Sequence, residues 1–466
     1  MAHQIQGVNH VDGMLPIPKL FAYGLQHVLA MYAGAVAVPI IIAQAMHLSG
    51  AQLIQLINAD LFTCGIATLI QTLGFWKIGA KIPLIQGITF AAVSPMILIG
   101  QEHGMTSIYG AVIVAGIVTF LISHLFSRLI RFFPPVVTGT IITIIGITLM
   151  PVSVRWVGGG NPSSPDFANP VNLFLAILTL VIVVAVYRFG KGFWSNVAVL
   201  VGLVVGTLVS MALGVANLGA VGEAEWFAVV TPLAFGWPTF EFSSIISMVI
   251  VMLVVMTETT GDCIAIGEIV EKPIGKKELA ACLRADGFAT MIGGLLNSFP
   301  HTAFAQNVGL VAVTNVKSRF VVAASGVILV LLGLFPKMAA VVASIPNPVL
   351  GGAGVAMFGM IIASGIRSLS KVQFDGTYNL MIVAISIGVS MIPLAVPTFY
   401  DHFPEWLKIV LHSGITFGSL MAVALNVLLN GYGNETHVVQ ATRREKAIAR
   451  LDKWKAERKV RRNRSI

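Results

Sequence analysis

Apolar residues form long, nearly uninterrupted runs along this chain, and short polar segments separate them. The run from Leu20 to about Ala45 contains no Lys, Arg, Asp or Glu. A helix needs about 20 apolar residues to cross a hydrocarbon core of about 30 Å. Because backbone polar groups must pair with one another inside a membrane, we expect these runs to form membrane-spanning helices.

The pattern predicts fourteen spans, arranged as two halves of seven. Lysine and arginine test this count, because cytoplasmic loops carry an excess of them. Loops after even-numbered spans hold fourteen such residues, and loops after odd-numbered spans hold three. This bias predicts that both termini are cytoplasmic. The approximate ranges of the spans are 20–44, 52–75, 82–99, 106–127, 135–152, 171–187, 194–215, 243–267, 280–298, 302–314, 318–343, 346–366, 376–396 and 410–430.

The third and tenth predicted spans are shorter and more polar than the others. Segment 82–99 begins at Pro83, and segment 302–314 contains Gln306 and Asn307. Each is third in its half, and interrupted spans at matching positions indicate an inverted repeat with the binding site between them. Because seven is odd, the halves would insert with opposite topology. Two re-entrant loops without a function are the alternative.

Composition supports a membrane environment. Hydrophobic residues make up 56% of the 466 residues, and charged residues 11%, against roughly 25% charged in soluble proteins. The net charge is +9, and residues 441–466 contribute eleven Lys and Arg less three Asp and Glu, a net of +8. We expect this tail to face anionic lipid rather than nucleic acid. Cys64, Cys263 and Cys282 show no disulfide or metal-ligand spacing, so we expect small buried residues.

Four carboxylates fall inside the predicted spans, where a charge costs several kcal/mol and usually serves a function. Glu258 and Asp262 are four residues apart and share one helix face. Such a pair can accept N–H groups from a heterocycle or hold a proton between its members; a buried structural pair is the alternative. Asp286 could be functional, could pair with Arg284, or could cap its helix. The role of Asp60 is open.

The interrupted spans offer recognition chemistry. Half-helix N-termini present unpaired N–H groups, which suit an acceptor-rich or anionic substrate. Gln306 carries a donor and an acceptor on one amide, as pairing with the amide edge of a ring requires, and Phe90 beside Thr89 could stack on that ring. His27 could be a structural partner or a proton carrier, and His301 could cap the tenth span. Together these residues favour a planar heterocycle over an inorganic ion.

Motifs of enzyme chemistry are absent from the sequence. It contains no HExxH, no GxSxG, no phosphate-binding GxxxxGKS or GxxxxGKT, and no CxxC. We therefore expect no enzyme, no metal site and no cofactor. The lack of a phosphate-binding loop argues against a built-in ATPase, so an ion gradient should drive transport. We take protons as the coupling ion, because no multi-carbonyl sodium site is recognisable. A membrane enzyme or a receptor would need a catalytic set or a soluble sensor domain, and the sequence shows neither.

Segment QNVGLVAVTN, residues 306–315, resembles the signature of the nucleobase–ascorbate transporter family. It matches that signature at Gln306, Asn307, Gly309 and Thr314, and departs from it at the last position, where Asn315 replaces the usual Arg, Lys or Gly. Further segments similar to the bacterial xanthine and uric acid permeases extend the resemblance over nearly the whole chain. They are LQHVLAMYAGAVAVP at 25–39, ETTGD at 258–262, RADG at 284–287 and NSFPHTAFAQN at 297–307.

The resemblance implies a substrate site. Glu258 matches the family's substrate-binding carboxylate, and Gln306 matches its partner. Phe90 and Ala305 match positions that line the site through a ring and the backbone. Thr89 holds a position that tends to be Asn in xanthine-only relatives and Ser or Thr in uric acid transporters.

The resemblance also implies supporting residues. Asn307 matches a position that supports the site's geometry, and His27 and Asp286 match polar positions needed for activity. Asp262 matches a further carboxylate of xanthine transporters. We therefore expect transport of both purines, with uric acid slightly ahead. The alternative substrate is uracil, another nucleobase or an anion. A basic residue at the start of the tenth span would favour an anion, and the sequence has none there.

The implied fold is all-helical and polytopic, with fourteen transmembrane segments in a 7+7 inverted repeat and short strands in spans 3 and 10. The resemblance further implies a bacterial inner-membrane protein that forms a homodimer through its gate domains and moves its core domain against them like an elevator. The expected partners are the purine, protons and membrane lipid, and nucleic acid is not among them. The implied division is 1–19 cytoplasmic N-terminus, 20–127 core domain (spans 1–4), 128–242 gate domain (spans 5–7), 243–344 core domain (spans 8–11), 345–432 gate domain (spans 12–14) and 433–466 basic cytoplasmic tail.

Overall fold

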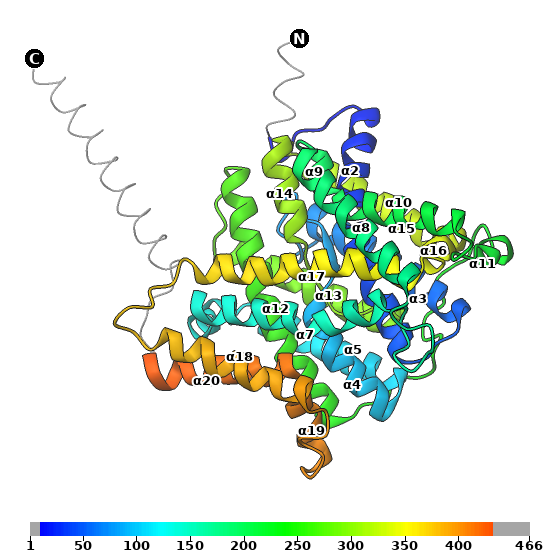
Figure 1. The fold of residues 1–466 in the computed structure, drawn as a ribbon. Coiled ribbons are helices and arrows are strands. Elements are labelled where there is room, and N and C mark those ends of the chain that lie inside the picture. The colour runs from blue at the N-terminus through cyan, green and yellow to red at the C-terminus, as the bar shows by residue number, and fades with distance from the viewer. Residues whose placement is uncertain (1–9, 432–466) are drawn as a thin grey trace, which may run out of the picture.

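The computed structural model describes residues 10–431, and helices account for most of this part of the chain (Figure 1). Residues 1–9 of the expected N-terminal segment and the basic tail at 433–466 lie outside the described residues. The elements are α2 (Ile17–Ala45), α3 (Gly50–Leu73), β1 (Gln86–Ile88), η1 (Phe90–Ala92), α4 (Val93–His103), α5 (Met105–Ile122), α6 (Phe126–Leu129), η2 (Ile130–Phe132), α7 (Pro135–Val157), α8 (Pro170–Phe189), α9 (Phe193–Asn196), α10 (Ala198–Ala212), α11 (Gly219–Glu223), α12 (Phe242–Ile269), α13 (Lys276–Leu295), β2 (His301–Ala303), α14 (Ala305–Thr314), α15 (Arg319–Gly333), α16 (Pro336–Ala343), α17 (Asn347–Leu369), α18 (Asn379–Ala395), α19 (Glu405–His412) and α20 (Gly414–Asn430).

Local sequence explains where individual helices begin. Ser49 precedes α3 and forms a capping box with Gln52, in which the Ser49 hydroxyl accepts the Gln52 N–H at 3.3 Å and the Gln52 side chain accepts the Ser49 N–H at 2.9 Å. Asn169 caps α8 by accepting the Asn172 N–H at 2.8 Å. Pro170, the first residue of α8, needs no intrahelical donor there. These caps satisfy N–H groups of the first helical turn that have no partner within the helix.

The predicted eleventh span, 318–343, is not a single helix. α15 ends at Gly333, α16 begins at Pro336, and the two are bent by 81°. Pro336 has no N–H for a helical bond, and the residue before a proline avoids the helical conformation. Phe335 accordingly adopts φ −115° and ψ 87°. The expectation of a plain span was wrong here, because a continuous apolar run conceals the break.

Seven of the described helices are long and apolar enough to cross a membrane, and the bent pair α15–α16 would make an eighth. The seven are α2, α3, α5, α7, α8, α12 and α17, while α10, α18 and α20 are apolar but shorter. The chain is therefore a multi-pass membrane protein. The count of fourteen segments stays a prediction.

Two short strands form in the two interrupted segments, as expected. β1 and β2 pair antiparallel, with Gln86 opposite Ala303 and Ile88 opposite His301. β1 leads into η1 and α4, and β2 leads into α14. The prediction of strands in spans 3 and 10 is confirmed, and the pairing brings the start of each following helix to the same region.

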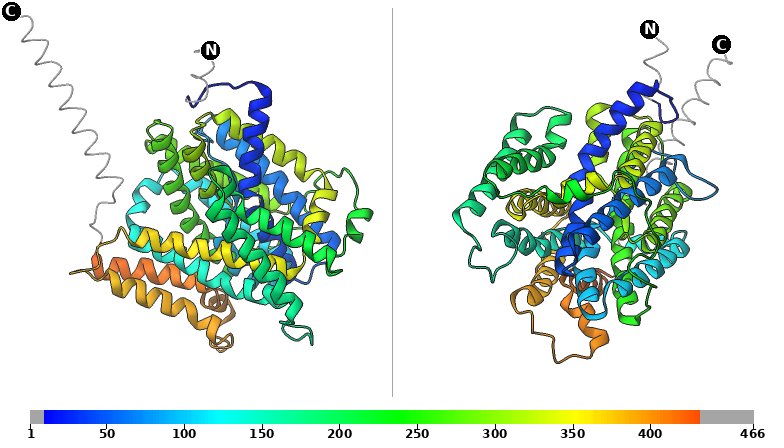
Figure 2. Two further views of the ribbon diagram at one scale, coloured as in Figure 1. Left: turned by 45° about the horizontal axis from the view of Figure 1, so that its top comes forward. Right: turned by 90° about the vertical axis from the view of Figure 1, so that its right-hand side faces the viewer.

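The helices pack in two sets, and the strand pair lies within one of them. α3 packs on α15, α13 on α5, and β1 and β2 lie against α2, α3, α12 and α13. In the other set α17 crosses the middle of Figure 1 and packs on α7, with α18 and α20 side by side below it. In the right-hand view of Figure 2, α2 runs through the middle of the molecule. The strands are thus enclosed by helices on several sides.

Candidate functional site

A two-stranded sheet leaves backbone groups unpaired at both edges, and buried threonines supply the missing partners. On the β1 side, the hydroxyl of Thr68 in α3 accepts the Gln86 N–H at 3.0 Å and donates to the Gln86 carbonyl at 3.3 Å. Thr68 and Gln86 are both fully buried. An unpaired backbone group that water cannot reach costs free energy. The two hydrogen bonds from Thr68 therefore stabilise β1 at this buried position.

The β2 edge is supported in the same way by two further helices. Thr259 of α12 accepts the Ala303 N–H at 3.3 Å, and its hydroxyl lies 3.2 Å from that of Thr302. Thr290 of α13 accepts the His301 N–H at 3.0 Å. His301 therefore belongs to a strand, and the expectation that it caps the tenth span was wrong. The sequence alone did not identify Thr68, Thr259 or Thr290 as supporting residues.

The N-terminus of α14 is open. Phe304 precedes the helix and provides no side-chain cap, and Ala305 and Gln306 are exposed. The first N–H groups of a helix have no intrahelical partner, and the helix dipole is positive there. A Cβ on Gly34 or Gly87 would lie 3.0 or 2.5 Å from the Phe304 ring. Glycine at both positions therefore lets the ring fit between α2 and β1, which positions the start of α14.

Glu258 and Asp262 are only partly buried, although they lie within a long apolar helix. Glu258 is adjacent to Thr259, which holds the strand that leads into Gln306. α12 also packs against α14. Asp262 lies within electrostatic reach of both Glu258 and Asp286. The structure therefore brings three of the predicted carboxylates together on α12 and α13, within the helix set that encloses the strands.

Phe90 and Thr89 begin the half-helix that follows β1. Phe90 is half-buried and meets Phe358 of α17 edge to face, with the ring centroids 5.9 Å apart. Phe90 thus lies where the two helix sets meet. Thr89 is buried, and its hydroxyl oxygen accepts the Ala91 N–H at 3.2 Å. Thr89 therefore caps η1, and its hydroxyl retains one hydrogen to donate.

Asn307 and His27 contact each other directly, which links α14 to α2. The Asn307 amide nitrogen donates to the His27 backbone carbonyl at 2.9 Å and lies 3.1 Å from His27 Nδ1. A carbonyl only accepts, so the nitrogen of the amide must face His27. Nδ1 then accepts the second amide hydrogen, and the imidazole hydrogen resides on Nε2. The contact fixes the orientation of the Asn307 amide and ties α14 to α2; its role in the substrate site stays a prediction.

Asp286 lies in the middle of α13 and is fully buried. It neither caps the helix nor pairs with Arg284, which donates to the Lys77 carbonyl at 3.0 Å, so both structural alternatives were wrong. Neither oxygen of Asp286 has a partner with hydrogen-bond geometry among residues 10–431. Thr259 and Gln86 are polar side chains that face it. The Gln86 amide also has no partner in the described part of the chain.

Asp60 has a structural contact that the sequence did not reveal. The Ser298 hydroxyl donates to Asp60 Oδ1 at 2.7 Å, and Cys64 Sγ lies 3.9 Å from Oδ2. Ser298 precedes β2, so Asp60 ties α3 to the segment that enters the strand pair. Cys64, Cys263 and Cys282 are free and buried, as expected.

Comparisons with known proteins identify the family to which the chain is similar. A model of a family described as the permease family matches residues 18–399. The uric acid transporter UacT of Escherichia coli strain K12 is 46% identical over 466 aligned residues, covering 99% of this chain and 96% of that protein. The xanthine permease of Bacillus subtilis strain 168 is 44% identical over 422 residues, covering 91% of this chain and 96% of that protein.

The fold is also similar to that of a solved transporter. The transmembrane domain of the cyanobacterial bicarbonate transporter BicA superposes with a TM-score of 0.57 and covers 86% of this chain and 97% of that domain. At 16% identity this likeness concerns the fold alone. By the match to its family model and by its relatives, the chain belongs to the nucleobase–ascorbate transporter family of permeases.

Proposed function

We propose that the chain imports the purine bases uric acid and xanthine by proton symport. The names of its relatives support the substrate class. The observation that carries the proposal is the link from α12 to α14. Thr259 accepts the Ala303 N–H at 3.3 Å, and Glu258 is its neighbour on α12, the helix that packs against the one carrying Gln306.

These groups match the edge of a purine. The Glu258 carboxylate can accept ring N–H groups, while Gln306 offers both a donor and an acceptor. The free N–H groups at Ala305 and Gln306 can donate to a ring carbonyl, and the helix dipole there favours negative charge on the substrate. The half-buried ring of Phe90 supplies a flat surface for stacking.

Proton coupling rests on the three carboxylates. Asp262 interacts electrostatically with Glu258 and Asp286 inside the span region, and two neighbouring carboxylates can hold one proton between them. Neither oxygen of Asp286 has a partner with hydrogen-bond geometry within the described residues, and the polar side chains of Thr259 and Gln86 face it, so a proton on this carboxyl group has polar neighbours. In the proposed cycle, a proton held among these groups moves with the purine and leaves with it.

The proposed transport movement is that of an elevator. Residues 20–127 and 243–344 would form the core domain, and 128–242 and 345–432 the gate domain. Packing supports a 7+7 inverted repeat, since span 2 (α3) packs on span 11 (α15) and span 4 (α5) on span 9 (α13). In such a repeat span 2 corresponds to span 9, and span 4 to span 11. Exchanging the two halves therefore converts the α3–α15 contact into the α13–α5 contact. The proposal also includes an inner-membrane location, cytoplasmic termini and a homodimer through the gate domains.

Uptake in a bacterial strain that lacks its own purine permeases tests the proposal. Labelled xanthine and uric acid should accumulate, a protonophore should abolish accumulation, and removing the sodium gradient should not. Glu258→Ala and Gln306→Ala should abolish uptake at normal protein levels. Uptake that survives both substitutions would refute the assigned site, and dependence on sodium would refute proton coupling.

An anion or another nucleobase is the second candidate, and the uncapped start of α14 is the observation that favours it. Competition by unlabelled uracil, bicarbonate and purines separates the two. Inhibition by purines alone supports the purine assignment, while inhibition by uracil or bicarbonate alone supports the second candidate.

A further inference from the structure

Gln86 of β1 has a polar backbone and a polar side chain, and only the backbone has hydrogen-bond partners. Its N–H and its carbonyl both bond to the Thr68 hydroxyl. Its side-chain amide is fully buried, and neither the oxygen nor the nitrogen has a partner with hydrogen-bond geometry among residues 10–431. A buried amide without partners costs free energy, so a glutamine here indicates a role other than packing.

The strand register directs this amide toward Asp286. Gln86 lies opposite Ala303, and directly opposed side chains of an antiparallel pair lie close together on one face of the sheet. Because the side chain of Ala303 is a single methyl group, it leaves room for the longer Gln86 side chain to extend across β2. At the far edge of β2, Thr259 accepts the Ala303 N–H at 3.3 Å. Asp286 of α13 faces both Thr259 and Gln86.

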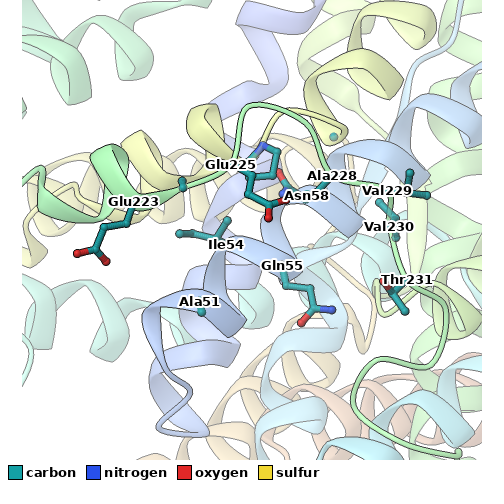
Figure 3. A pocket seen from close by; sticks show the side chains of 13 residues that line it. Ala51, Ile54, Gln55, Asn58, Glu223, Glu225, Ala228, Val229, Val230 and Thr231 are labelled. Atoms are coloured by element: carbon teal, nitrogen blue, oxygen red, sulfur yellow. The ribbon is translucent and has the colours of Figure 1, made fainter.

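These three polar side chains are shielded from water. Gln86, Thr259 and Asp286 are each 0% exposed. The hollow of about 390 Å³ shown in Figure 3 lies beside the first half of α3, and none of the three lines it. Asn58 is the lining residue of α3 closest in sequence to Thr68, and the two lie about 15 Å apart along the helix axis. Each protonation state of Asp286 therefore depends on neighbouring side chains rather than on this hollow.

The ionised form of Asp286 depends on hydrogen-bond donors. None of the ion pairs found among residues 10–431 involves it. Two acidic groups interact with it electrostatically, Asp262 of α12 and Cys282 one turn earlier in α13. His301 of β2 lies on the same face of the strand pair as Gln86 and is fully buried. The amide of Gln86 and the hydroxyl of Thr259 are thus the donors that can stabilise the carboxylate.

We propose that Gln86 is a positioning residue that lets Asp286 take up and release its proton during purine uptake, an inference that rests on the proposed proton symport. The Gln86 amide nitrogen donates to the carboxylate, and after a 180° rotation of the amide its oxygen accepts the O–H of the protonated acid. The proton arrives from water by way of Asp262, which is partly exposed. It resides on an Asp286 oxygen and returns to water when the purine leaves.

The same contacts connect the proton to the candidate purine site. Gln86 begins β1, which leads into Thr89 and Phe90. Thr259 supports β2, which leads into α14. Loss of the proton strengthens the contacts of Asp286 with both side chains, because charge-assisted hydrogen bonds are shorter and about twice as strong as neutral ones. The positions of both strands, and with them purine binding, therefore respond to the protonation of Asp286.

The test compares Gln86→Met with the parent protein in a bacterial strain that lacks its own purine permeases. Methionine has a similar length and removes both polar atoms, and the loss of a buried unpaired amide has little cost in stability. Without this donor Asp286 should keep its proton. Exchange of internal labelled xanthine for external unlabelled xanthine should then persist, while accumulation driven by the proton gradient should fall about tenfold or more.

The pH dependence of exchange gives a second readout, which a merely structural role would not move. The pH at which exchange falls to half its maximum should rise by about one unit, a tenfold change in proton affinity, as loss of one charge-assisted hydrogen bond predicts. Gln71→Met is the matched control. Gln71 is also a fully buried glutamine, but its amide nitrogen donates to Cys282 Sγ at 2.9 Å. This control should match the parent in accumulation and in the pH dependence of exchange.

The outcomes separate the role of Gln86 from the proposed function. If the parent is proton-driven and Gln86→Met accumulates xanthine equally well, the role of Gln86 is overturned while symport stands. Loss of exchange together with accumulation in folded Gln86→Met, or the same defects in Gln71→Met, would also overturn it. A parent that accumulates xanthine without a proton gradient would overturn both proposals. Gln86→Leu, which also lacks the amide, provides the same comparison if the methionine variant does not fold.

Discussion

Replacement of Thr259 by valine tests whether the strand pair depends on side chains from neighbouring helices. Valine has nearly the shape of threonine but lacks the hydroxyl. The change removes the acceptor for the Ala303 N–H, 3.3 Å away, and the contact with the Thr302 hydroxyl at 3.2 Å. Thr259 is fully buried and Thr302 is 5% exposed, so water cannot replace these contacts without rearrangement.

The expected magnitude follows from the groups left unpaired. A buried unsatisfied donor costs about 1–3 kcal/mol, and side-chain hydrogen bonds measured in a membrane protein contribute on average about 0.6 kcal/mol, with a maximum near 1.7. We therefore expect Thr259→Val to cost about 1–2 kcal/mol, which changes an equilibrium by a factor of about 5–30. Because Ala303 leads directly into α14, the loss should also raise the KM for purine uptake.

A matched control exists in α5. Thr119 is also buried, but its hydroxyl donates to the Ala115 carbonyl of its own helix at 2.8 Å. Thr119→Val removes a similar group without leaving a strand N–H unpaired, so it should cost only about 0.6 kcal/mol and leave KM unchanged. The assays are thermal unfolding in detergent and initial rates of uptake. Equal effects of the two substitutions on stability and on KM would refute the reasoning.

Three further predictions concern other contacts. Glu258→Gln should abolish purine uptake yet preserve the folded protein, as judged by gel filtration; substantial uptake would contradict its role. Ser298→Ala should cost about 1–2 kcal/mol, and combining it with Asp60→Asn should cost less than the sum of the single changes, because they share one contact; strict additivity in thermal unfolding would argue against that contact. The Arg319 hydrogen bond lowers the pKa of Asp12, so the stability it provides is present above the unfolded pKa of about 3.9 and lost as pH falls below it. The unfolding midpoints of the parent and Asp12→Asn should differ at pH 6 and converge toward pH 3, and a difference that persists at pH 3 would contradict this.

The helices were predictable because the membrane requires long apolar runs. The expected span 20–44 corresponds to α2 at Ile17–Ala45, and 243–267 to α12 at Phe242–Ile269. Interrupted segments were also visible, since polar residues and prolines stand out in an apolar sequence. The location of the strands came from the family resemblance, because three-residue strands have no periodicity long enough to detect.

Other features depend on contacts that sequence does not show. Threonine in an apolar helix often bonds to its own backbone, as Thr119 does, and nothing in the sequence separates it from Thr68 or Thr259. The sequence pattern predicts Asp286 near the start of span 280–298, because the polar residues before it are typical of a loop. In the structure α13 already begins at Lys276, so Asp286 lies in the middle of the helix. In each case the three-dimensional neighbours, and not the residue type, determine the role.

Direct binding of labelled xanthine and uric acid to the purified protein tests the central claim, that the region between Glu258 of α12 and Gln306 of α14 holds a purine. The parent protein should bind both purines saturably, and Thr119→Val should bind them equally well. Glu258→Gln and Gln306→Ala should each lose binding while remaining folded. Unchanged purine affinity in both site variants would contradict the account.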